Sequence, residues 1–211
     1  MSTPRNLLRR NDLRFATFAR SLSAADWQRP SLCTEWTNHD VLAHVVYGYR
    51  ASPVTMITEM ARKRGSFDRA NAALAQGLAA RRTPTELIDE LETRIDARRG
   101  IGRVFPPRLL LGDHVVHELD IALAIGREPQ VAAEALAAVL ETQVRVPNPF
   151  IPARTRAHGL VLHAADADWR YGVAGPVVTG SAAHLASVLA GRSCALDYLT
   201  GNGVAVLRSR L

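Results

Sequence analysis

The chain has 211 residues, of which 47% are hydrophobic and 22% are charged, as in an average globular protein. This length accommodates one large domain or two small ones with a substantial core. No run of about 18 apolar residues is present, which excludes a membrane-spanning helix. The N-terminus lacks the apolar segment and cleavage site of a secretory signal. We therefore expect a cytoplasmic protein without a membrane partner.

The net charge of +6 and the pI near 10.1 raise the question of nucleic-acid binding. The basic residues cluster at positions 62–64, 81–82 and 98–99, interleaved with acidic residues as on a solvated helix face. Aromatic side chains that could stack on bases are scarce in this region, which contains Phe67 and Phe105. We therefore do not expect nucleic acid as a partner.

Two cysteines, Cys33 and Cys194, are far apart in the sequence and neither belongs to a CxxC pair. In a reducing compartment they are expected to be free thiols. Cys33 is a candidate nucleophile, but no neighbouring residue in the sequence would lower the pKa of its thiol. We expect Cys33 to be a small packed residue.

The first two-thirds of the chain predicts helices. A broad apolar stripe predicts an amphipathic helix over residues 7–22. Thr37 is a favourable N-cap, and Asp40 at the third helical position suits the positive end of a helix. The helix that follows runs past Tyr49 and is apolar on nearly every side, which is typical of a buried helix. His44 would be buried with it.

Four further helices continue this pattern. Thr83 and Glu86 form a capping box with proline at the first helical position. Glycines and prolines break the chain at residues 100–107. The predicted helices after the one at Thr37 cover residues 67–80, 84–98, 108–125 and 131–144.

The sequence changes character after a proline-containing linker at residues 147–152. Alternating and β-branched segments predict three short strands, followed by a helix and a final short element. The strands are predicted at 160–164, 169–173 and 176–179, and the helix at 181–191. The fold class is therefore mainly α, with a helical domain in residues 1–146 and a small α+β domain in residues 153–211.

Titratable residues crowd the helix predicted over residues 108–125. Asp113 and His117 are four residues apart, so their side chains project from one face of this helix. An imidazole from a distant helix, such as His44, would complete a set of two histidines and one carboxylate. Such a set suits zinc or a similar divalent ion with one coordination position left open.

Spacing alone leaves other ligand sets open. His114 pairs with His117 at i,i+3, and His114 with Glu118 is a weaker combination. A simpler interpretation is a polar helix face with one Asp–His hydrogen bond. Four other histidines are expected to be bystanders, namely His39, His158, His163 and His184.

Three segments, in the same order along the chain, resemble one known family. Residues 27–44 read Trp-Gln-Arg-Pro-Ser-Leu-Cys-Thr-Glu-Trp-Thr-Asn-His-Asp-Val-Leu-Ala-His, and residues 117–127 read His-Glu-Leu-Asp-Ile-Ala-Leu-Ala-Ile-Gly-Arg. Together with residues 175–207 they resemble the mycothiol-dependent maleylpyruvate isomerase family, within the DinB-like metalloenzyme superfamily. The resemblance implies a DinB-like four-helix bundle with a long crossover, followed by a small α/β domain.

The resemblance also implies a ligand set. Carried over residue by residue, the divalent metal, zinc above all, is held by His44, Asp113 and His117. The isomerase has glutamate where this chain has Asp113, so the helix would lie closer to the metal or a water would intervene. Asp120, three residues beyond His117, is a candidate acceptor for the second imidazole N–H of His117, and a plain surface or helix-packing aspartate is the alternative. Candidates for binding the thiol or a carboxylated substrate are Arg50, Arg154 and Arg192.

The function implied is that of a metal-dependent and mycothiol-dependent transferase or isomerase. Its cofactors are a divalent metal and mycothiol, and its partners are a low-molecular-weight thiol and a small electrophile. The metal-bound thiolate would attack the electrophile. A homodimer is the candidate oligomeric state. The alternatives are a hydrolase or an S-transferase for another thiol on the same site, or a non-catalytic binding or sensor protein of the same fold.

Overall fold

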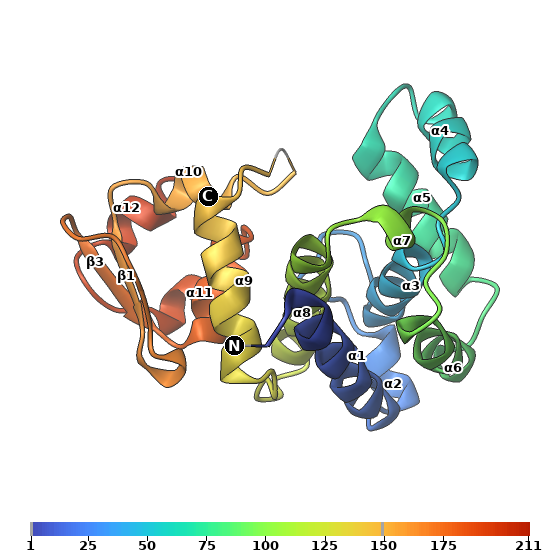
Figure 1. Cartoon of the computed structure of the whole chain (residues 1–211), viewed down its shortest axis with the longest axis horizontal. Helices are drawn as coiled ribbons and strands as arrows, with labels where there is room; N and C mark the ends of the chain where they lie inside the picture. The colour runs from blue at the N-terminus through green and yellow to red at the C-terminus, as the bar shows by residue number, and fades with distance from the viewer. Residues whose placement is uncertain (1, 149) are drawn as a thin grey trace. The chain divides into compact units, whose positions relative to one another are not determined.

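The structure is a computed structural model that describes residues 2–148 and 150–211, with the backbone alone at residue 101. Pro149 of the predicted linker lies outside the described residues. The fold is mainly α with a small sheet near the C-terminus (Figure 1), as predicted. Within the described residues, no helix has both the length and the apolarity needed to cross a bilayer.

Four helices form the core of the first compact unit, which ends at Glu128. They are α1 (Pro4–Arg20), α3 (Asn38–Gly48), α6 (Pro84–Ile95) and α8 (Pro107–Ala124). Helix α1 packs against α6 and α8, and α3 packs against the same two helices, so the four close into a bundle. Their buried faces meet through large apolar side chains, including Phe15, Leu42, Leu87, Leu91 and Leu119.

Local signals in the sequence place the ends of these helices. Thr37 caps α3, because its hydroxyl accepts a hydrogen bond from Asp40 N at 3.2 Å and Asp40 Oδ2 accepts one from Thr37 N at 2.9 Å. Thr83 and Glu86 make the same reciprocal pair at the start of α6. Both helix starts were predicted from the capping pattern and are confirmed.

Several short helices were not predicted. Helix α2 (Ala24–Gln28) is one turn that positions Trp27 in the core. Helix α4 (Pro53–Arg62) packs on α5 (Phe67–Ala79), which in turn packs on α3. Within α4, Met56 is buried, while Val54 and Ile57 are exposed. Helix α7 (Ile101–Val104) is a single turn inside the predicted break.

The second compact unit begins at Pro129 and contains the sheet. Strands β1 (Val161–Ala164), β2 (Trp169–Tyr171) and β3 (Val177–Gly180) are arranged in the order β2-β1-β3. Strand β1 is antiparallel to β2 and parallel to β3, with Leu162 paired to both Tyr171 and Val178. The three strands agree with the predicted ones to within two residues.

Helices accompany this sheet within the same unit. They are α9 (Ala133–Arg145), α10 (Ala153–Ala157), α11 (Ala182–Leu189) and α12 (Val204–Arg208), with 3-10 turns η1 (Ala165–Ala167) and η2 (Ser193–Tyr198). The sequence predicts a division at residues 147–152, whereas the chain passes from one compact unit to the other after Glu128. The difference arises because α9 packs against α10 and α11.

Candidate metal centre

The three predicted ligands lie together between α3 and α8. His44 Nε2 on α3 is 3.4 Å from Asp113 Oδ2 on α8. His117 Nε2, one turn further along α8, is 3.6 Å from Asp113 Oδ1. One donor atom from each of the three residues lies within 4.8 Å of the other two. Packing of α3 against α8 and the i,i+4 spacing on α8 together produce this arrangement.

The donor set and its spacing fit a tetrahedral divalent ion. Donor atoms about 2.0–2.1 Å from a tetrahedral zinc are separated from one another by about 3.3–3.5 Å. The 3.4 and 3.6 Å separations between imidazole nitrogens and carboxylate oxygens are close to this value. The shorter aspartate side chain at position 113 therefore reaches both imidazoles. Its 38% side-chain exposure, against 12% for His44 and 11% for His117, leaves one side of the cluster accessible.

The electrostatics of the cluster keep Asp113 ionised. Partial burial opposes its negative charge, but the neighbouring imidazoles of His44 and His117 outweigh this effect and hold the pKa of Asp113 well below its usual range. Metal ligation requires a deprotonated carboxylate. This side chain is therefore already in its ligand form at neutral pH.

Asp120 orients the imidazole of His117 through the ring nitrogen Nδ1. Its side chain is fully buried, and its Oδ2 lies 3.1 Å from His117 Nδ1. With the proton on Nδ1, the ring donates to this carboxylate and turns the lone pair of Nε2 toward Asp113. His44 differs, because its buried Nδ1 has no hydrogen-bond partner among the described residues.

Trp36 packs against both imidazoles. Its ring centroid lies 5.2 Å from that of His44 and 6.0 Å from that of His117, and the two histidine rings are 4.6 Å apart. The indole is 9% exposed, so it shields this side of the cluster from water. Trp36 belongs to one of the sequence motifs, but the sequence does not predict this contact, because no spacing rule gives the direction of a tryptophan side chain in a loop.

The alternative ligands face elsewhere. His114 Nδ1 lies 2.8 Å from Asp12, and its ring packs on Tyr49. Burial disfavours the charged form of His114, but Asp12 outweighs burial and raises the pKa of His114. The carboxylate of Glu118 accepts hydrogen bonds from Arg14. The alternative pairs of His114 with His117 or Glu118 therefore do not converge.

The described residues form a second cluster of potential ligands, from Cys33, His117 and Asp120. Neither cluster includes the expected bystanders His39, His158, His163 and His184. Among the candidate arginines, Arg50 pairs with Glu90 at 3.2 Å, and Arg192 donates to a main-chain oxygen of its own unit.

The fold and the cluster define a class of protein, a helical bundle with two histidines and one carboxylate gathered between two of its helices. Residues 8–108 match the family model described as the mycothiol maleylpyruvate isomerase N-terminal domain. This part of the chain, which contains His44, is therefore similar to that domain. The resemblance drawn from the sequence motifs is confirmed.

Two solved structures are similar to nearly the whole chain. One is a crystal structure of a histidine-to-alanine mutant of the mycothiol-dependent maleylpyruvate isomerase, with a TM-score of 0.54 and 17% identity. The other is a crystal structure of the mycothiol-dependent maleylpyruvate isomerase, with a TM-score of 0.51 and 17% identity. Each match covers 94% of this chain and 91% of the other. At this identity the likeness concerns the fold. Among curated proteins, none matches this chain.

Proposed function

We propose that this protein is a metal-dependent and thiol-dependent isomerase or transferase. A zinc-like ion would be held by His44, Asp113 and His117, and mycothiol would be the activated thiol. The proposal rests above all on the convergence of these three side chains at a spacing suited to a tetrahedral ion. The match of residues 8–108 to the mycothiol maleylpyruvate isomerase N-terminal domain supports the choice of thiol and the enzymatic role.

When bound, a divalent ion supplies Lewis acidity that favours a thiolate over a thiol at its open position. The residues of this chain set the conditions for that chemistry. Around a divalent ion, two neutral imidazoles and one carboxylate would leave a net positive charge, which attracts a sulfur anion. Asp120 keeps Nε2 of His117 directed at the site, and Trp36 keeps water from one side of it.

The reaction follows from the properties of a thiolate. Its sulfur attacks an electron-poor carbon of a small electrophile, and a new carbon–sulfur bond forms. If that bond breaks again after rotation about a neighbouring carbon–carbon bond, the product is an isomer and the thiol is regenerated. If the bond is retained and the product is protonated, the product is an S-conjugate. Both outcomes use the same protein groups.

A turnover assay with maleylpyruvate and mycothiol tests the proposal. Wild-type protein should require both the thiol and a divalent ion, and chelation should abolish turnover. His44→Ala should lower the rate on the order of 100-fold, as expected for a disrupted metal site. His39→Ala is the matched control, since His39 lies on the same helix and outside both ligand clusters.

Two results would contradict the proposal. Metal-dependent hydrolysis without any thiol would favour a hydrolase on the same site. Absence of both stoichiometric metal and turnover, with a range of thiols and electrophiles, would favour a non-catalytic binding protein.

A further inference from the structure

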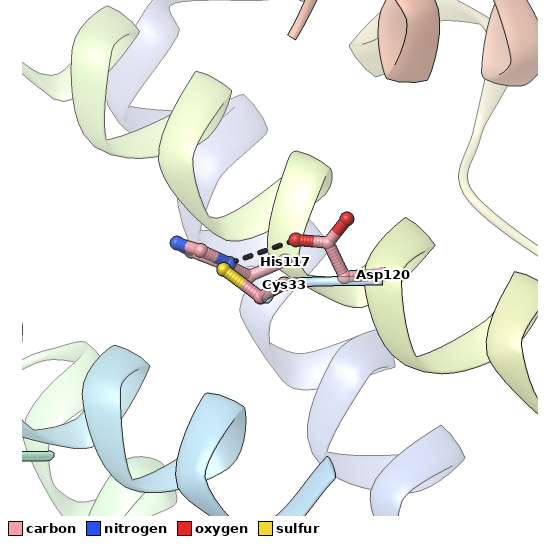
Figure 2. Close-up of side chains that lie close together, drawn as sticks. All are labelled: Cys33, His117 and Asp120. Atoms are coloured by element: carbon pink, nitrogen blue, oxygen red, sulfur yellow. Dashed lines mark hydrogen bonds and ion pairs between the residues drawn. The ribbon is translucent and has the colours of Figure 1, made fainter. Parts of the chain in front are cut away.

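The second ligand cluster joins the loop before α3 to helix α8. Cys33 lies in this loop, whereas His117 and Asp120 lie one turn apart on α8. Figure 2 shows the three side chains gathered around one edge of the His117 ring, and one donor atom from each lies within 4.8 Å of the other two. Cys33 is half-buried and Asp120 is fully buried.

Backbone hydrogen bonds fix the position of the thiol. Leu32 N donates to Asp120 O at 3.2 Å, which ties the loop to α8 beside the cluster. Cys33 N donates to Ser31 Oγ at 3.1 Å, and Trp36 N donates to Cys33 O at 3.1 Å. The cysteine is thus held in a hydrogen-bonded turn next to the buried carboxylate.

The two clusters use opposite edges of the same imidazole. His117 Nε2 faces Asp113. His117 Nδ1 faces Asp120 at 3.1 Å, as Figure 2 shows. A neutral imidazole offers one nitrogen lone pair at a time, because the other nitrogen carries the proton. His117 can therefore serve one cluster or the other, but not both while it remains neutral.

We propose that Cys33, His117 Nδ1 and Asp120 form a second cation site, specific for thiophilic ions and mutually exclusive with the site at His44 and Asp113. Thiolate ligands select soft and borderline ions over hard ones. An ion bound here releases the thiol proton to solvent and shifts the imidazole proton of His117 from Nδ1 to Nε2, so the lone pair of the neutral ring no longer faces Asp113. Thiophilic ions would thereby disable the first site through His117.

Cadmium titration of the metal-free protein tests this proposal. A cadmium–thiolate bond gives an ultraviolet charge-transfer absorption, which reports sulfur ligation directly and does not depend on activity. Wild-type protein and Cys194→Ser should both show this absorption, saturating at about one ion per chain. Cys33→Ser should lose it. Cys194 is an internal control because it is exposed and lies in the other unit.

Two further variants separate this site from the first one. Asp120→Asn, which removes the negative ligand, should raise the cadmium concentration at half-saturation by about tenfold or more. Asp113→Asn should leave the absorption intact, so a failure of the first site would not affect this result. Zinc loaded at the first site should raise the cadmium concentration at half-saturation in wild-type protein. The same zinc should raise it much less in Asp113→Asn.

Clear outcomes would overturn the inference. Absence of the absorption in wild-type protein would do so, as would its persistence in Cys33→Ser. An Asp120→Asn variant that binds cadmium as tightly as wild type would show that the Asp120 carboxylate does not hold the ion.

Discussion

The buried carboxylate of Asp12 joins three helices of the bundle, and its removal is expected to destabilise the first unit strongly. Asp12 on α1 is fully buried, accepts a hydrogen bond from the Tyr49 hydroxyl on α3, and lies 2.8 Å from His114 Nδ1 on α8. Asp12→Ala would leave a phenol and an imidazole without this partner, both in the core.

The size of the effect follows from these contacts. Each buried polar group left unsatisfied costs about 1–3 kcal/mol, and breaking a buried charged pair costs about 3–5 kcal/mol. We expect Asp12→Ala to lower the free energy of unfolding by about 3–5 kcal/mol, a large part of the roughly 5–15 kcal/mol typical of a domain. Asp12→Asn keeps one oxygen acceptor and should cost about 1–3 kcal/mol.

Urea unfolding followed by tryptophan fluorescence measures this change. The chain has three tryptophans, and Trp169 is the one in the second unit, so a Trp169→Phe background reports on the first unit. Leu13→Ala, at a 40% exposed position next to Asp12, should change stability by about 0.5 kcal/mol or less. A loss below about 1 kcal/mol for Asp12→Ala, with an unchanged denaturant slope, would refute the reasoning.

Three further predictions concern the same bundle. Burial of Tyr49, together with the Asp12 carboxylate that the phenol contacts, raises the pKa of Tyr49 above the value of about 10 in the unfolded chain. The stability contributed by the protonated phenol is therefore present below pH 10 and is lost as the pH rises further. Urea unfolding at increasing pH should therefore show a steeper alkaline loss for wild type than for Tyr49→Phe, and equal slopes would contradict this. Thr37→Ala removes the N-cap of α3 and should cost about 1 kcal/mol, measured by thermal unfolding; no shift in midpoint would count against the cap. Gly102→Ala should be destabilising, since its Cβ would lie 2.6 Å from the main-chain oxygen of Gly48, whereas Gly112→Ala on α8 meets open space and should stabilise by about 0.5–1 kcal/mol. If both alanine substitutions change the midpoint of thermal unfolding equally, the backbone at Gly102 does not lie as close to that of Gly48 as the structure has it.

Much of the bundle could be predicted from sequence because its signals are local. Reciprocal capping at Thr37 and at Thr83 sets two helix starts, and the i,i+4 spacing of Asp113 and His117 places them on one face. The pairing of His44 with that face required the family resemblance, since spacing says nothing about which distant helix packs nearby. The role of these three residues in metal binding stays a prediction.

What the sequence did not predict depends on non-local packing. The direction of the Trp36 side chain and the approach of Cys33 to His117 are set by a loop anchored to α8 through Leu32. The partner of His114 is Asp12, which lies 102 positions earlier in the chain.

The most direct test of the metal centre is elemental analysis of protein purified without chelators. Wild type and His39→Ala should carry about one zinc-like ion per chain, and His44→Ala should carry much less. Equal metal content in all three proteins would contradict the assignment of His44 as a ligand. Absence of stoichiometric metal in wild type, even after zinc, nickel or manganese is supplied, would contradict the metal centre itself.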